Sequence, residues 1–217
     1  MDFLQLDSNL FLFLNGIHSP FSDAFMYQYS GKWIWIPMYI ALLYTLWYNF
    51  KWRMFLLIVL GIALTFALTD QITVSVIRPD VARLRPAQPG NPISHLVHIV
   101  NGYRGGRYSF PSAHAANTFG LACFVWLLFR KWWCTLFLMG WATLACYSRI
   151  SLGVHYPGDL LAGALVGFAA ATAVFLIFRK VSKYKPQPTI HRLYVPLCAG
   201  GLTIIAISVY AAIETIF

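Results

Sequence analysis

The sequence predicts an all-α integral membrane protein in which six helices cross the bilayer and one N-terminal helix lies along its surface. Hydrophobic residues make up 59% of the 217 residues and charged residues only 11%, whereas soluble proteins average roughly 25% charged residues. Apolar stretches recur along the whole chain at close to the length of about 20 residues that a helical span needs. None of them alternates between apolar and polar residues as membrane strands do.

The first 31 residues are expected to lie at the membrane surface rather than cross it. Their apolar run Leu10–Leu14 is too short to span, and the Asn15 and Gly16 that follow are typical of a helix end. No basic residue precedes Lys32, so the segment lacks the positive start of a cleavable signal peptide. Residues 1–31 therefore predict an interfacial helix at the start of a single membrane domain that covers residues 1–217.

Six apolar stretches follow as predicted spans, joined by short connections. The third and fourth are short, so we expect both helices to extend into their flanks. Gly163 and Gly167 form a GxxxG pattern in the fifth, which favours close packing against another helix. The predicted spans are Trp33–Phe50, Met54–Val76, Ala115–Phe129, Trp132–Tyr147, Leu160–Phe178 and Leu193–Phe217.

Basic residues predict how the helices are oriented in the membrane. Connections between successive spans alternate sides, and one side holds nine of the sixteen Lys and Arg residues and no acidic residue. By the positive-inside rule this side is cytoplasmic and the other side faces outward. The compact chain with short loops favours a bacterial origin, for which the outward side is the periplasmic side of the inner membrane. The nine residues are Lys51, Arg53, Arg130, Lys131, Arg179, Lys180, Lys183, Lys185 and Arg192.

The periplasmic connections carry arginine but no lysine after the first span, and the planar arginine fork suits bidentate capture of phosphate. After the second span come Arg78, Arg83 and Arg85, and Arg149 ends the fourth. Taken alone, such a cluster is also explained by arginines that extend from the membrane edge into water. Asp70 lies two helical turns before Arg78, and we expect it to brace that arginine.

Two further stretches place histidines at the start of a helix. In PSAH, Ser112 is suited to cap the third span, which would direct the helix N-terminus and His114 at an anion. In SRISLGVHYPGD, Asp159 follows His155 by four residues, so its carboxylate would fix the tautomer and leave the other nitrogen as a nucleophile or base. Each stretch alone also fits an ordinary capped helix. Together with the arginines they suit phosphoryl transfer to histidine, without a carboxylate cluster for Mg²⁺.

These stretches resemble the motifs of type 2 phosphatidic acid phosphatases, the PAP2 family, which belongs with the vanadium haloperoxidases. The family motifs are K-x6-R-P, P-S-G-H and S-R-x5-H-x3-D. Here arginine stands at the lysine position of the first motif, Arg78, and alanine replaces glycine at position 113 in the second. The third motif is complete. The motifs cover residues 78–159, in order and at matching spacing.

The resemblance implies that His155 attacks phosphorus, Asp159 orients it and His114 protonates the leaving oxygen. It implies a lipid phosphatase without cofactor or metal, acting on a membrane lipid and not on nucleic acid. Substrate candidates are undecaprenyl diphosphate, a phosphate of lipid A and phosphatidylglycerol phosphate. A lipid phosphotransferase that passes the phosphate to an alcohol, or a non-enzymatic lipid-binding or transport protein, stays as an alternative. The residues implied to hold the phosphate are Arg78, Arg85, Ser112, the Ala113 amide and Arg149.

Two sets of possible metal ligands remain. His95 and His98, three residues apart, could bind a metal, but other ligands are missing nearby in the sequence, so packing within the loop is favoured. The cysteines show no CxxC spacing and fall within predicted spans, which favours packing over disulfides or metal binding. They are Cys123, Cys134, Cys146 and Cys198.

Overall fold

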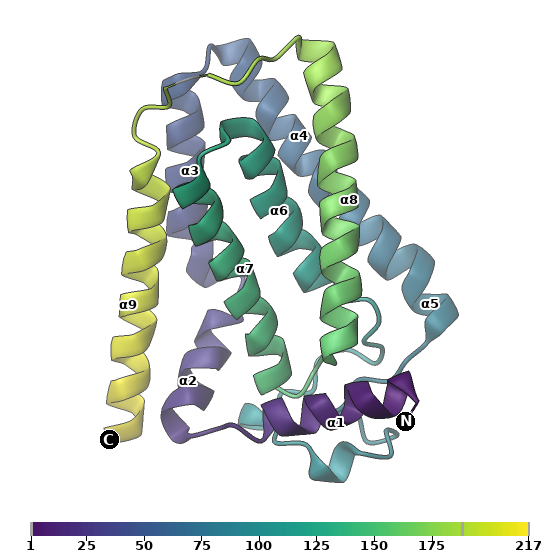
Figure 1. The fold of residues 1–217 in the computed structure, drawn as a ribbon. Helices are drawn as coiled ribbons and strands as arrows, with labels where there is room; N and C mark the ends of the chain where they lie inside the picture. Colours follow the sequence, from purple (N-terminus) through teal and green to yellow (C-terminus); the bar gives the residue numbers. More distant parts are fainter. Residues whose placement is uncertain (1, 188, 217) are drawn as a thin grey trace.

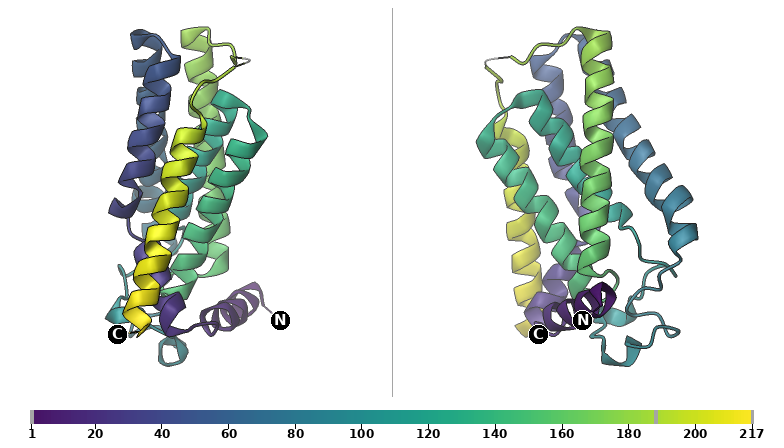
Figure 2. Two further views of the ribbon diagram at one scale, coloured as in Figure 1. Left: turned by 90° about the vertical axis from the view of Figure 1, so that its left-hand side faces the viewer. Right: turned by 45° about the vertical axis from the view of Figure 1, so that its right-hand side comes forward.

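The computed structural model describes residues 2–187 and 189–216, which form helices and connecting loops and no strand. Long helices stand side by side in a bundle, and α1 (Phe3–Asn15) lies across one end of it (Figures 1 and 2). The other helices are α2 (Pro20–Tyr29), α3 (Ile36–Asn49), α4 (Trp52–Asp70), α5 (Arg78–Val81), α6 (Ala113–Phe129), α7 (Trp132–Ser151), α8 (Pro157–Ser182) and α9 (Tyr194–Ile216).

All six predicted stretches are helical. The third and fourth extend into their flanks as expected, because α6 begins at Ala113 and α7 continues to Ser151. Phe217, at the end of the sixth stretch, lies outside the described residues. Among the described helices, three are long and apolar enough to cross a membrane by length and composition: Trp52–Val81, Pro157–Ser182 and Tyr194–Ile216.

The first of these long helices changes its winding near its end. Between α4 and α5 the chain forms a π-helix, Gln71–Ile77, which the sequence did not predict. Such segments are rare and are frequently found at functional sites. Here the segment carries the chain from Asp70 to Arg78, and both residues line the cavity described below.

Helix α8 packs directly against α6, as the GxxxG pattern predicted. A Cβ atom at Gly163 would collide with the carbonyl oxygen of Ser112, and one at Gly167 would collide with that of Ala116. The absence of side chains at these positions lets the two backbones approach closely. This packing fixes the start of α6 beside the start of α8, where the amide of Ser112 donates to the carbonyl of Asp159 at 3.0 Å.

The outer surface of the bundle is apolar. On α8, for example, Leu161 and Leu165 are each 69% exposed, which would be unfavourable over a large surface in water but suits lipid. Helix α1 also exposes apolar residues such as Phe13, while it buries two polar residues, Asp7 and Asn15, against the bundle.

The connections at the two ends of the bundle differ in which residues they carry. The long connection between α5 and α6, the turn between α7 and α8, and helix α1 gather at one end (Figure 1). The links from α3 to α4, from α6 to α7 and from α8 to α9 lie at the opposite end. All motif residues from the sequence therefore belong to the α1 end of the bundle or to helix ends that point toward it.

Candidate active site

Ser112 and His114 are positioned by the start of α6. Ser112 is the N-cap, as predicted, and its Oγ accepts a hydrogen bond from the Ala115 amide at 3.3 Å. Ala113 and His114 line a cavity of about 1350 Å³ inside the bundle. Ser112 itself is fully buried and does not line that cavity. The first turn of α6 therefore presents an imidazole and the positive end of a helix dipole to the cavity.

His155 and Asp159 are positioned by the start of α8, where Pro157 occupies the first turn as predicted. His155 lines the same cavity although it is only 2% exposed, and Asp159 lies behind it, fully buried. The Nδ1 atom of His155 lies 3.5 Å from Oδ2 of Asp159, which is longer than a hydrogen bond. That oxygen accepts from the Tyr156 amide at 2.9 Å. The carboxylate is thus fixed by the backbone and stands next to the imidazole.

The buried position of His155 controls its charge. Burial, together with the positive charges of Arg85, Arg149 and Arg78, holds the pKa of the His155 imidazole well below its ordinary value. The ring is therefore neutral at neutral pH, and one nitrogen keeps a lone pair.

Arg78, Arg85 and Arg149 converge on the cavity from three different segments, and each keeps a buried nitrogen without a hydrogen-bond partner. These nitrogens are Nε of Arg78, Nη1 of Arg85 and Nε of Arg149. An unpaired buried donor costs about 1–3 kcal/mol, so three such donors at one place form a site that needs an anion. Gly105, with a φ of 65°, lets the backbone lie close to the Arg85 guanidinium, because a Cβ atom at this position would collide with that group.

Other contacts hold these guanidinium groups in place. Arg78 donates to the Pro111 carbonyl at 3.0 Å, and Nε of Arg85 donates to the Tyr108 carbonyl at 3.1 Å. Burial and the neighbouring Arg149 and Arg78 lower the pKa of Arg85 to about 10, so the group stays charged at neutral pH. Arg149 donates to the Tyr103 hydroxyl at 3.2 Å and to the Ser30 hydroxyl.

The rest of the cavity wall is largely apolar and aromatic. It extends away from the arginines between α3, α4, α6 and α7. A space with cations at one end and an apolar wall at the other fits a phosphate attached to a large apolar molecule. Residues of this wall include Trp35, Tyr39, Leu42, Ile62, Phe66, Leu121 and Trp141.

The structure adds two residues to the site that sequence reasoning missed. Nη1 of Arg83 contacts Oδ1 of Asp159 at 3.0 Å and Oδ2 of Asp7 at 2.7 Å. The other oxygen of Asp7 accepts from the Gly158 amide at 2.8 Å. Helix α1 therefore supports the carboxylate behind His155. Arg83 was visible as part of the arginine cluster, but no pattern in the sequence links it to Asp7.

Asp70 does not form the expected ion pair with Arg78. Its Oδ1 atom instead accepts a hydrogen bond from Nδ2 of Asn117 at 3.0 Å, and the Asn117 amide oxygen accepts from the Thr69 hydroxyl at 2.5 Å. The negative charge of Asp70 still acts on Arg78 without a direct ion pair, and both residues line the cavity.

Comparisons with known proteins agree with this geometry. A model of the PAP2 superfamily matches residues 50–183. The chain is 45% identical to lipid A 4'-phosphatase of Bacteroides thetaiotaomicron over 99% of this chain and 100% of that protein. It is 38% identical to lipid A 4'-phosphatase of Porphyromonas gingivalis over 81% of this chain and 74% of that protein. The crystal structure of Aquifex aeolicus LpxE is similar, with a TM-score of 0.59, 25% identity, and coverage of 79% of this chain and 95% of that one.

Proposed function

The chain belongs to the PAP2 superfamily and is a membrane lipid phosphatase, and from this premise we propose that it removes the 4'-phosphate of lipid A through a phosphohistidine on His155. Among the candidate lipids, lipid A is favoured because two relatives that align over most of this chain carry that activity in their names. The cavity of about 1350 Å³ also exceeds the roughly 300–1,000 Å³ typical of small-molecule sites, as a bulky lipid headgroup requires.

The observation that carries the proposal is the set of three arginines, each with a buried and unpaired nitrogen, around a neutral, buried histidine. The arginines would bind the equatorial oxygens of the phosphoryl group with the donors that now lack partners. The Ala113 amide at the start of α6 would add a donor on the same side. Ser112, which does not line the cavity, would position this helix start as its N-cap. Positioning and charge stabilisation supply most of the rate enhancement in phosphoryl transfer.

In the first step a nitrogen of His155 attacks phosphorus, and the bond from phosphorus to the sugar oxygen breaks. His114 gives its proton to that oxygen, so the dephosphorylated lipid leaves as an alcohol. Asp159 stabilises the positive charge that develops on the imidazole, and Arg83 and Asp7 hold Asp159 in place. In the second step water attacks the phosphohistidine, His114 takes a proton from the water, and inorganic phosphate is released.

We place this chemistry at the periplasmic face of the inner membrane, with all six apolar helices crossing the bilayer as one domain. The basic connections lie at one end of the bundle and the motif residues at the other (Figure 1). The positive-inside rule assigns the end with the basic connections to the cytoplasm. Helix α1 would lie in the interface, because it turns Asp7 and Asn15 toward the protein and apolar residues outward.

A test of the substrate uses purified protein and three lipids: bisphosphorylated lipid A, undecaprenyl diphosphate and phosphatidylglycerol phosphate. We expect phosphate release from lipid A to be fastest, with mass spectrometry of the product showing loss at the 4' position. Preference for either other lipid, or loss of the other lipid A phosphate, would refute the assignment. Repeating the assay with an added alcohol identifies phosphotransfer, because a phosphorylated alcohol would then replace part of the free phosphate.

A further inference from the structure

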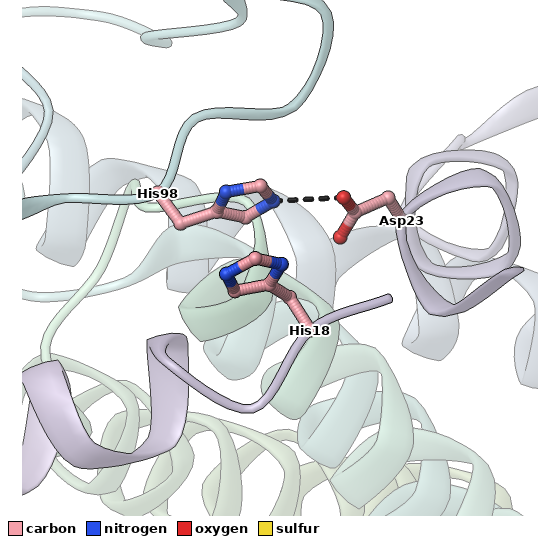
Figure 3. Close-up of side chains that lie close together, drawn as sticks. All are labelled: His18, Asp23 and His98. Atoms are coloured by element: carbon pink, nitrogen blue, oxygen red, sulfur yellow. Dashed lines mark hydrogen bonds and ion pairs between the residues drawn. The ribbon is translucent and has the colours of Figure 1, made fainter. Parts of the chain in front are cut away.

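Three residues from separate segments meet outside the active-site cavity, at the α1 end of the bundle. His18 belongs to the linker between α1 and α2, Asp23 to the first turn of α2, and His98 to the connection between α5 and α6. Nε2 of His98 lies 2.8 Å from Oδ2 of Asp23, and the His18 ring stacks on the His98 ring (Figure 3). One ligand atom from each residue lies within 4.8 Å of the other two.

The second oxygen of Asp23 is the observation that points to a ligand. Its Oδ1 atom is buried and has no hydrogen-bond partner. In the part of the chain that the structure describes, every other buried side-chain nitrogen or oxygen in this state belongs to a residue that lines the active-site cavity. Three of these atoms are arginine nitrogens, and unpaired donors at a cavity indicate an anionic ligand. By the same reasoning, an unpaired carboxylate oxygen beside two imidazoles indicates a missing cation.

The two histidine rings lie close together beside the carboxylate. The ring centroids of His18 and His98 are 3.7 Å apart and the ring planes differ by 4°. The lone pair of an imidazole lies in the plane of its ring, so one of the stacked rings must turn before both can reach one ion. Figure 3 shows Asp23 beside both rings. A divalent cation among the three side chains would pair the free carboxylate oxygen.

Two of the three ligands are already held in place. Asn15, which is buried, accepts from the His98 amide at 2.8 Å and donates to the His98 carbonyl at 3.1 Å. Its side chain also donates to the Ile150 carbonyl at the end of α7. Asp23 is fixed on a helix. His18 is exposed on a short linker, so its side chain has room to turn toward the ion.

We propose that His18, Asp23 and His98 bind one divalent transition-metal ion of the Zn²⁺ type, with water as the fourth ligand. Two imidazoles and a carboxylate are a recurrent zinc ligand set, with metal–ligand distances of about 2.0–2.2 Å. The ligand atoms, now within 4.8 Å of one another, would draw together through side-chain rotation. None of the three residues lines the active-site cavity, so the ion takes no part in the reaction, and the inference does not depend on the proposed function.

The ion would cross-link the segments that hold Arg149. The side-chain partners of that arginine are Ser30, which follows α2, and Tyr103, in the connection that contains His98. Asp23 and His98 belong to these same two segments. A metal that joins them would stabilise the folded protein and limit the movement of the connection beside the phosphate site.

The test uses the full chain purified in detergent with an affinity tag that contains no histidine. The protein is stripped of metal with a chelator, desalted, incubated with zinc chloride and desalted again. The bound zinc is then measured by inductively coupled plasma mass spectrometry. We expect one retained zinc ion per chain and a higher melting temperature with zinc. Cobalt(II) in its place should give the visible d–d absorption of a low-coordinate site.

Three variants and a matched control make the test specific. His18→Ala, His98→Ala and Asp23→Asn should each lose the retained zinc and the zinc-dependent rise in melting temperature. His95→Ala should keep both, because His95 is exposed on the same connection and outside the cluster. His18 is an exposed linker residue, so its variant is expected to fold even if the others do not. Absence of zinc from the wild type, or equal retention by His18→Ala and His95→Ala, would overturn the proposal.

Discussion

Two histidine–aspartate pairs lie in connections or helix ends at the same end of the bundle, and they differ in burial, charge and geometry. His155 and Asp159 are buried, with side chains 3% and 0% exposed, and Nδ1 and Oδ2 lie 3.5 Å apart. His98 and Asp23 are partly open, at 27% and 20%, with a contact of 2.8 Å. Three arginines line the cavity with His155 and a fourth, Arg83, contacts Asp159, whereas a second imidazole stacks on His98.

The difference shows that the surroundings, rather than the residue types, decide what such a pair binds. Burial and the nearby arginines keep His155 neutral, and the arginines have unpaired donors, which favours an anion and nucleophilic attack. Beside His98 the unpaired atom is an acceptor, Oδ1 of Asp23, which favours a cation. The same two residue types, histidine and aspartate, are thus assigned to phosphate chemistry in one pair and to metal binding in the other.

Removal of each histidine gives the largest contrast. His155→Ala should lower kcat by roughly five orders of magnitude or more, the range seen when a catalytic nucleophile is lost, and no phosphoenzyme should form. His98→Ala should keep most of the activity at a temperature where the variant is folded. The measurement is phosphate release from lipid A by both variants, with melting curves as a control for folding. Similar losses in the two variants would remove the distinction between the pairs.

The second histidine of the catalytic site should fail in a different way. His114→Ala removes the proton donor, which is typically worth about 10²–10⁴-fold, but keeps the nucleophile. A substrate with a good leaving group, such as p-nitrophenyl phosphate, needs little protonation and should be partly spared, whereas lipid A should not. Kinetics of this variant on both substrates distinguish the roles. An equal loss on both would make His114 a phosphate-binding or structural residue.

Much of the buried pair could be predicted from the sequence, because its parts are local. Asp159 follows His155 by one helical turn, and the N-cap at Ser112 is set by its neighbours, so spacing alone predicted both. The helical stretches were equally visible, since each is a continuous apolar run. The π-helix was not, because no residue pattern marks it. The brace predicted between Asp70 and Arg78 is an electrostatic interaction rather than a direct ion pair.

The second pair could not be assembled from spacing. The sequence favoured packing for His98 and offered His95 as its only possible metal-binding partner, but the structure leaves His95 exposed and brings His98 to Asp23, 75 residues away. Asp7 and Arg83, 76 residues apart, are a similar case. In both, a tertiary contact between α1 or α2 and the α5–α6 connection creates the site.

A smaller effect tests whether α1 contributes to the buried pair. Asp7→Asn leaves Arg83 with Asp159 as its only ion-pair partner among the described residues, so Arg83 should shift and reposition Asp159. We expect kcat/KM to fall about tenfold, equivalent to about 1.4 kcal/mol, with bound zinc unchanged. Asp2→Asn, at an exposed position preceding the same helix, is the matched control. Equal activity of the two variants would make Asp7 irrelevant to catalysis.

The charge around His155 should be visible in the pH dependence. Burial and the neighbouring arginines lower the pKa of His155, so the acid limb of kcat/KM should lie below the ordinary histidine value of about 6.5. Arg85→Gln removes one of the positive charges and should move that limb upward. The phosphate substrate itself titrates at about pH 6, so both proteins are compared on the same substrate. A limb that stays in place, or moves down, would contradict the assignment.

Chelation should give the smallest effect on turnover and separates the two pairs most directly. Among the described residues, Asp70 is the only carboxylate that lines the active-site cavity, and it is already hydrogen-bonded, so EDTA should leave kcat unchanged in protein that stays folded. The same treatment should lower the melting temperature of the wild type but not of His98→Ala, whose site is already broken. Orthovanadate should inhibit both proteins equally, because it mimics the pentacovalent transition state on His155. Loss of kcat on chelation with restoration by Mg²⁺, in the wild type and in His98→Ala alike, would place a metal in the reaction itself and overturn the metal-free mechanism.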